Sequence, residues 1–225
     1  MNYIIDDGYR ADWVKNAFFD GIFEIPIIKK QRDYIPKNLV PFTMRNKTTG
    51  KEEILCFYEK DEKFLDLINN PEEYIGDLKK FKGVISVDAS LYIDMPLILQ
   101  ITNVYFNRAI GHYLQEKGIF VIPNIRWGDE RTYTTKELPE KIAFLGVEKH
   151  SIVAIGSYGQ IKSKEDKFYF REGLASMLDE LNPSIVLVYG NMSPKIFNDF
   201  LDKATFVFYE DWISRKKGEK AHGNN

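Results

Sequence analysis

Residues 83–125 read GVISVDASLYIDMPLILQITNVYFNRAIGHYLQEKGIFVIPNI, and this stretch contains one complete strand-helix-strand unit. A Val/Ile-rich run at 84–87 is followed by a polar turn, then by a helix that we expect at 96–117, and then by a second apolar run at 120–125. The helix has Pro at its first position and Gly118 directly after its last, which is the usual placement of these two residues. Because parallel strands need a crossover of about a dozen residues or more, the stretch predicts two neighbouring parallel strands.

The same alternation of apolar runs and helices continues to residue 209. Ser163 is a candidate N-cap for a second helix, which Asn182-Pro183 ends. Ser193-Pro194 begins a third helix, which we expect to reach about Lys203. The remaining apolar runs are at residues 152–155, 185–189 and 206–209.

These runs are continuously apolar rather than alternating in polarity, which is typical of strands covered on both faces. The sequence therefore predicts an α/β fold with a mainly parallel sheet of about five strands and helices on both faces. The alternative is an incomplete eight-stranded, TIM-like barrel that also uses N-terminal strands. Pairing between the run at 206–209 and an N-terminal strand would decide for the barrel.

The first 82 residues are less regular than the rest of the chain. Prolines in or beside two of the three apolar runs confine those runs to sheet edges or extended segments. We predict a single domain over residues 1–214, in which residues 1–82 wrap a βα core at 83–214, and a polar, disordered tail at 215–225. The three N-terminal runs are at residues 23–28, 39–44 and 54–58.

The composition excludes several classes of protein. The apolar runs are much shorter than the roughly 18 residues of a membrane span, and no positively charged segment precedes an apolar run at the N-terminus. We therefore expect no membrane partner and a cytoplasmic location. Cys56 is the only cysteine, which excludes an intramolecular disulfide and a Cys-based zinc site. The net charge of -2 provides no overall basic field for nucleic acid, although a local basic patch is compatible with it. The oligomeric state is left open.

Polar side chains follow the predicted strands, at the end of the sheet where parallel folds bind their ligands. Carboxylates, amides, hydroxyls, aromatic rings and an arginine would gather there, which indicates a polar and partly planar ligand. The candidate residues are Asp88, Ser90 and Asp94 after the first run; Asn124, Arg126, Trp127, Asp129 and Glu130 after the second; Ser157 and Tyr158 after the third; and Tyr189 and Asn191 after the fourth.

The helix at 96–117 presents three amide side chains at spacings of three and four residues. Gln100, Asn103 and Asn107 either bond the neighbouring loops or contact a ligand, because buried amides need partners. Gln100 and Asn103 are therefore candidate substrate-binding residues. Arg108 follows Asn107, and we expect it to reach an acidic partner.

The inventory of reactive side chains favours carboxylate chemistry. No two histidines lie at metal-ligand spacing, and the serine-hydrolase elbow, the dinucleotide fingerprint and the Walker loop are missing. Hydrolysis of an N-glycosidic bond and magnesium-assisted phosphodiester hydrolysis are the two reactions that remain. The first needs no cofactor or metal, with Asp88 and Asp94 as candidate catalytic residues. The second would use those two carboxylates with Asp129 and Glu130 around Mg²⁺.

Each of these residues also has a purely structural interpretation. Asp88 is in position to bond the backbone amides of the turn that follows its strand. Asp94, which precedes Pro96 closely, is a candidate helix N-cap. Asp129 and Glu130 lie between arginines and are compatible with surface ion pairs.

Two blocks of sequence resemble a known family. Residues 85–96, with the amides and arginine of the following helix, and residues 121–130 are similar in order and spacing to the family called domain of unknown function 4417, whose members occur in phages, plasmids and bacterial mobile elements. The resemblance covers about residues 39–189 and departs from the family pattern at Val87, Ala89 and Tyr158. It implies a setting in the replication or conflict of mobile DNA, and hence a nucleic acid or nucleotide partner, but no particular activity.

Together these observations lead to a DNA-directed hydrolase of the glycosylase type as the first functional hypothesis. Asp88 would orient the attacking water, Asn124 and Asn191 would read the base, Trp127 or Tyr158 would stack on it, and Arg126 would hold the phosphate. The alternatives are the magnesium-dependent nuclease and a non-catalytic phage factor that binds a nucleotide or a protein.

Overall fold

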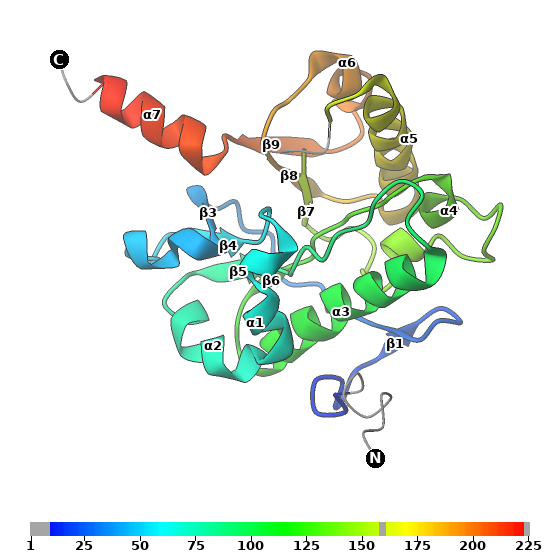
Figure 1. Ribbon diagram of the computed structural model, residues 1–225, viewed down its shortest axis with the longest axis horizontal. Coiled ribbons are helices and arrows are strands. Elements are labelled where there is room, and N and C mark those ends of the chain that lie inside the picture. The colour runs from blue at the N-terminus through cyan, green and yellow to red at the C-terminus, as the bar shows by residue number, and fades with distance from the viewer. Residues whose placement is uncertain (1–9, 158–160, 223–225) are drawn as a thin grey trace.

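The computed structural model describes residues 10–157 and 161–222, and its centre is made of parallel strands (Figure 1). Four strands pair in the order β3 (Asn38–Pro41), β4 (Glu53–Cys56), β5 (Gly83–Ile85) and β6 (Val121–Ile122). Three more pair in the order β7 (Val153–Gly156), β8 (Ile185–Tyr189) and β9 (Thr205–Tyr209). A parallel bridge between Asn124 and Ala154 connects the two sheets, so the strands follow one another in space as they do in sequence. A separate antiparallel pair consists of β1 (Phe19–Asp20) and β2 (Ile25–Pro26).

The helices begin close to the positions that the sequence predicts. Helix α3 starts one residue after Pro96, and Gly118 follows its C-cap with a φ of +77°, a backbone conformation that favours glycine. Ser163 caps α5 in a capping box with Asp166. The helices are α1 (Leu65–Asn69), α2 (Pro71–Leu78), α3 (Leu97–Glu116), α4 (Glu130–Tyr133), α5 (Lys164–Leu181), α6 (Pro194–Phe197) and α7 (Trp212–His222), with short 3₁₀ turns η1 (Phe42–Lys47), η2 (Asp61–Lys63), η3 (Ile142–Phe144) and η4 (Asn198–Phe200). The third predicted helix is therefore shorter than expected and continues as η4.

The α/β class with parallel strands is confirmed, but the helices are distributed differently from the expectation. Helix α3 packs with Val84 and Val121 on one face of the first sheet, and α5 packs with Val153 and Val186 on one face of the second. The other faces of the two sheets meet in a shared cluster whose described members all come from strands and the segments beside them. Parallel strands in sequence order, joined by crossovers of the usual right hand, put the connecting helices on the same side, so the sheets curve around this cluster.

The two outer strands approach each other without pairing. The Tyr209 hydroxyl at the end of β9 donates a hydrogen bond of 2.7 Å to the Pro36 carbonyl ahead of β3. A cavity of about 320 Å³ lies between residues 35–39 and 207–210. Along the described chain no backbone ladder joins β9 to β3, so the barrel alternative is not realised as a closed barrel.

Two segments outside the predicted core are more ordered than expected. Strands β3 and β4 belong to the stretch predicted as an irregular wrap, and β4 lies inside the first sheet. Helix α7 occupies most of the predicted disordered tail, because Asp211 accepts the backbone N–H groups of Ile213 and Ser214 and Trp212 packs against the core. Within the described ranges, no helix has the length and apolar character that crossing a membrane requires.

Candidate active site

A buried carboxylate lies at the carboxyl end of β5. Asp88 is 2% exposed, its Oδ1 accepts a hydrogen bond of 2.7 Å from Asn124 Nδ2, and its Oδ2 accepts one of 2.7 Å from Arg126 Nη1. The Tyr58 hydroxyl donates to Asn124 Oδ1 at 3.0 Å. The segments that follow β4, β5 and β6 therefore each contribute a side chain to one hydrogen-bonded cluster, which we call the Asp88 cluster.

The backbone on both sides of Asp88 is fixed by buried polar side chains. The Ser86 hydroxyl accepts the Asn124 backbone N–H at 2.8 Å, which ties the end of β5 to the end of β6. Asn107 on α3 accepts the Ala89 N–H at 2.8 Å and donates to the Ala89 carbonyl at 3.2 Å. The carboxylate is thus held on a rigid support, as a functional group that must be placed accurately requires.

Burial determines the protonation of this cluster. It raises the pKa of Asp88 to about 6, against the opposing effects of the Arg126 charge and the Asn124 hydrogen bond. Burial and the neighbouring Asp88 charge also raise the pKa of the Tyr58 hydroxyl, which therefore stays a neutral donor. A carboxyl group that changes charge near pH 6 in a partly open site is suited to proton transfer.

Asp88 lies at the wall of a cavity of about 470 Å³, which we call the Asp88 cavity. Three of its acidic residues, Glu59, Asp61 and Glu62, are absent from the sequence-based candidates, as is its exposed aromatic ring, Tyr92. The Asp61 carboxylate accepts both the backbone N–H and the hydroxyl of Ser90, at 3.0 and 2.8 Å. The cavity is lined by Tyr58, Glu59, Lys60, Asp61, Glu62, Asp88, Ser90, Tyr92, Arg126 and Lys162.

The missed acidic residues follow a signal that the sequence contains. The apolar run at 54–58 ends directly before Glu59, as the other strands end before their candidate residues. Applying the strand-end rule to this run as well would have found Glu59 and Asp61. Because residues 1–82 are predicted to form an irregular wrap, the sequence-based candidates do not include Glu59 and Asp61.

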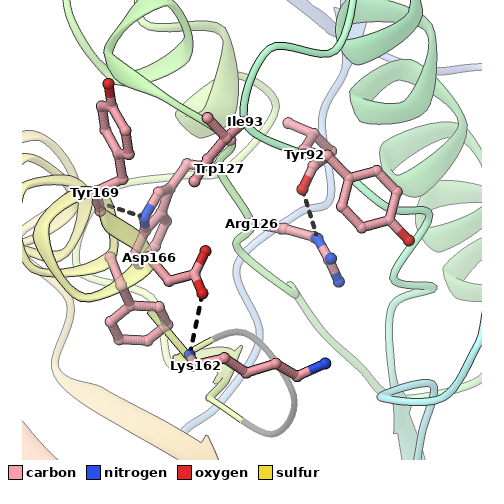
Figure 2. A pocket seen from close by; sticks show the side chains of 10 residues that line it. Tyr92, Ile93, Arg126, Trp127, Lys162, Asp166 and Tyr169 are labelled. Atoms are coloured by element: carbon pink, nitrogen blue, oxygen red, sulfur yellow. Dashed lines mark hydrogen bonds between the residues drawn. The ribbon is translucent and has the colours of Figure 1, made fainter. Parts of the chain in front are cut away.

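A second cavity of about 380 Å³ adjoins the first, and Tyr92, Arg126 and Lys162 line both. We call it the Trp127 cavity. Figure 2 shows Trp127 and Asp166 on one side of it and Tyr92 and Arg126 on the other. Trp127 is only 6% exposed, packs against Phe170 and donates from Nε1 to the Tyr169 carbonyl at 3.1 Å.

The carboxylates proposed for a nuclease do not converge. Asp129 caps α4 and binds the Arg131 guanidinium at 2.6 Å, and its Oδ2 accepts the Asp94 backbone N–H at 2.9 Å. Asp94 does not cap α3, because the N-cap is Pro96 and no side chain completes the cap. Glu130 lies in the first turn of α4, next to Asp129. Among the residues that the structure describes, no three His, Cys, Asp or Glu side chains are grouped for a metal ion.

The amide side chains of α3 bond the loops beside them. Asn103 Nδ2 donates to the Ser90 carbonyl at 2.7 Å, and Gln100 Nε2 donates to the Met95 carbonyl at 2.8 Å. The first of these bonds supports the loop that follows Asp88. Both amides lie outside the residues that line the two cavities.

Arg108 has a structural role that the sequence did not predict. Its guanidinium donates to the carbonyls of Leu145, Asn124 and Ala143 at 2.9, 2.8 and 3.0 Å. The side chain is 2% exposed, and burial lowers its pKa to about 10. The expectation that it reaches an acidic partner is wrong, because the last turns of α3 lie inside the protein, where the chain around η3 presents carbonyl oxygens.

Of the candidate residues that follow β7 and β8, some lie in the protein interior and one lies at the surface. The Ser157 hydroxyl donates to the Asn191 carbonyl at 2.8 Å. Tyr189 stacks on Tyr58, with ring centroids 5.2 Å apart, and its hydroxyl accepts the Trp212 N–H at 3.0 Å. The Asn191 side chain is exposed, and Tyr158 lies outside the described residues.

The chain is similar in sequence to two phage proteins. It is 30% identical over 204 residues to the "Gene 1 protein" of Mycobacterium phage L5, and the match covers 89% of this chain and 85% of that protein. It is 31% identical over 173 residues to the "Gene 1 protein" of Mycobacterium phage D29, and the match covers 76% of this chain and 61% of that protein. No solved structure matches the chain at a significant level.

The family model described as "Domain of unknown function (DUF4417)" matches residues 17–210. The match includes both blocks that resemble this family and all members of the Asp88 cluster. The chain therefore belongs to the DUF4417 family.

Proposed function

We propose that the protein is a DNA-directed hydrolase of the N-glycosidase type, acting in the cytoplasm of a phage-infected or phage-carrying cell, with Asp88 as its catalytic residue. The observation that carries the proposal is the buried Asp88 carboxyl, held by Asn124 and Arg126 beside a cavity at the carboxyl ends of parallel strands. The similarity to phage proteins supports the setting, and the cations at the cavity support a phosphate-containing substrate.

In this reaction Asp88 accepts a proton from water while the water oxygen bonds to C1′ of the sugar. The C1′–N bond breaks, the electron pair leaves with the base, and the negative carboxylate stabilises the positive charge that develops on the sugar. An ionised carboxylate has about four acceptor positions, and Asn124 and Arg126 together use two of them. The remaining positions belong to a carboxyl group that lines the Asp88 cavity, where the proposal places the attacking water.

The roles of the other residues differ from the first hypothesis. Both amide atoms of Asn124 are engaged, by Tyr58 and Asp88, so Asn124 is a positioning residue rather than a reader of the base. Tyr92 is 59% exposed and lines the Asp88 cavity, whereas Trp127 lines only the adjoining cavity, so Tyr92 is better placed to stack on the target base. Arg126 and Lys162 are in position to hold phosphate.

A non-catalytic nucleotide-binding factor is the second candidate. The observation that favours it is the 2% exposure of Asp88, whose two oxygens already accept strong hydrogen bonds. In that case the carboxylate orients Arg126 toward an anionic ligand and takes part in no reaction. Replacing Asp88 by Asn separates the candidates, because a binder of anions keeps its ligand when a nearby negative charge is removed.

The test is incubation of the full chain with single- and double-stranded DNA, modified and unmodified, in EDTA, followed by alkali to cleave abasic sites. We expect alkali-labile sites, a rate that rises with pH to a plateau above about 6, and a loss of at least about 100-fold in Asp88→Asn. Asp129→Asn is the matched control, because it removes another buried carboxylate that lies outside both cavities. Absence of strand scission on every DNA would refute the hydrolase, and scission only with magnesium would favour a nuclease.

A further inference from the structure

The Trp127 cavity has a different chemistry from the Asp88 cavity beside it. The Asp88 cavity is lined by four acidic residues, which are Glu59, Asp61, Glu62 and Asp88. The Trp127 cavity is walled by aromatic and aliphatic side chains and contains a single carboxylate, that of Asp166. Because the two compartments adjoin and share Tyr92, Arg126 and Lys162, they fit two neighbouring parts of one ligand.

Cationic groups lie where the compartments meet. Arg126 and Lys162 line both cavities, and Figure 2 shows Arg126 beside Tyr92 and Lys162 below Asp166 at the Trp127 cavity. Arg126 uses Nη1 for Asp88 and Nε for the Leu91 carbonyl, at 2.7 and 3.4 Å. Its Nη2 has no hydrogen bond to another described residue, so it is available for an anion.

We propose that the Trp127 cavity is a second nucleobase subsite, and that the protein binds single-stranded nucleic acid as a dinucleotide unit. The target nucleoside occupies the Asp88 cavity, the phosphate between the two nucleosides lies on Arg126 and Lys162, and the neighbouring base packs against Trp127. The identity of the first subsite rests on the proposed function. The second subsite rests on the aromatic lining and the shared cations.

The charge distribution limits the ligand to a short stretch of one strand. Glu59, Asp61 and Glu62 border the Asp88 cavity, and the whole chain has a net charge of -2. A longer phosphate backbone would pass these carboxylates, and paired bases cannot enter two separate cavities. One phosphate contact also predicts a weak salt dependence, with a slope of log K against log salt near -0.7 for a single strand.

Isothermal titration of the full chain with thymidine monophosphate, the thymidine dinucleotide and the trinucleotide tests this proposal. We expect the dinucleotide to bind about 5- to 150-fold more tightly than the mononucleotide, the range that corresponds to stacking of one base. The third nucleotide should add less than twofold. Equal affinities for the mononucleotide and the dinucleotide, or a gain that continues with each added nucleotide, would overturn the proposal.

Tryptophan fluorescence locates the second base, because the chain contains only three tryptophans. The dinucleotide should quench the emission, the quenching should disappear in Trp127→Phe, and it should persist in Trp212→Phe, whose residue lies outside both cavities. Quenching that survives in Trp127→Phe would contradict the placement of the base.

A second pair of variants avoids the core position of Trp127. Ile93→Asp introduces a carboxylate at the Trp127 cavity and not at the Asp88 cavity. Ile98→Asp is the control, because it introduces a carboxylate at a position on α3 that is 67% exposed. The dinucleotide advantage should be lost in the first and kept in the second, with mononucleotide affinity unchanged in both. If both variants keep the dinucleotide advantage, the proposal is overturned.

The result is separable from that of the hydrolase test. A dinucleotide advantage with no abasic product in any DNA would refute the proposed hydrolase and leave the second subsite in place. Abasic product with equal affinity for the mononucleotide and the dinucleotide would support the proposed hydrolase and refute the second subsite.

Discussion

Replacing Asp88 by Asn should change the pH dependence of stability in a defined direction. Burial raises the pKa of Asp88 from 3.8 to about 6 in the folded protein. Below pH 3.8 the carboxyl is protonated in both the folded and the unfolded chain, so burial of a charge costs nothing. As the pH rises through about 6, the folded protein must carry the buried charge, and this part of its stability is lost.

The magnitude follows from the pKa values. A tenfold change in a proton-binding constant is worth about 1.4 kcal/mol, so the rise from 3.8 to about 6 corresponds to about 3 kcal/mol. Asn resembles the protonated carboxyl in shape and does not titrate. The free energy of unfolding of Asp88→Asn, measured relative to the wild type, should therefore increase by about 2 kcal/mol between pH 4 and pH 7.5, because the rest of the effect occurs below pH 4.

Urea unfolding followed by circular dichroism at intervals between pH 4 and pH 8 measures this difference, because other titrating groups cancel between the two proteins. Asp129→Asn provides a control without such a rise. Burial raises the pKa of Asp129, but the hydrogen bonds from Arg131 and from the Asp94 backbone outweigh it and leave the pKa below its ordinary value of 3.8. The advantage of the wild type over this variant is therefore lost only as the pH falls below about 4, and the difference between the two should stay flat from about pH 5 to pH 8.

A difference between wild type and Asp88→Asn that is flat with pH, or that has the opposite sign, would refute the reasoning. It would mean that burying the charged Asp88 carboxylate does not destabilise the folded protein. The expected result would identify a charge that the fold retains at a cost of about 3 kcal/mol, which is typical of functional sites rather than of packing.

Two substitutions test the structural roles of other residues by urea unfolding. Arg108→Met leaves three buried carbonyls without their donor and should destabilise the protein by about 3 kcal/mol or more; a loss below about 1 kcal/mol would contradict the role. Ser163→Ala removes the hydroxyl half of the α5 capping box and should cost about 1 kcal/mol, while an unchanged midpoint would show that the cap contributes nothing.

Several features of the fold were predictable because they depend on near neighbours along the chain. The cap of α5 is a contact between Ser163 and Asp166, and the end of α3 at Gly118 depends on the conformation of one residue. The parallel arrangement followed from the alternation of apolar runs with helices, and the general place of the site followed from the ends of those runs.

Other features depend on pairs of residues that are far apart in sequence. Asp88 is 38 residues from Arg126, and Asp61 is 29 residues from the Ser90 that holds it. Composition cannot tell whether an acidic residue of this kind will meet a cation, a backbone amide or solvent. Asp129 has a cation two residues away and pairs with it, but its carboxylate is buried, so the predicted position of this ion pair at the surface is wrong.

The sequence by itself determined the α/β class, the positions of most helices and strands, and the residues after β5 and β6 from which the site is built. Only the tertiary structure decided that the sheets curve around a shared cluster, that Arg108 binds carbonyls, and that Glu59 and Asp61 join Asp88 at one cavity. The reason is physical. Local structure follows from backbone preferences and short-range capping, whereas the surroundings of a polar side chain, and with them its pKa, follow from which strands become neighbours.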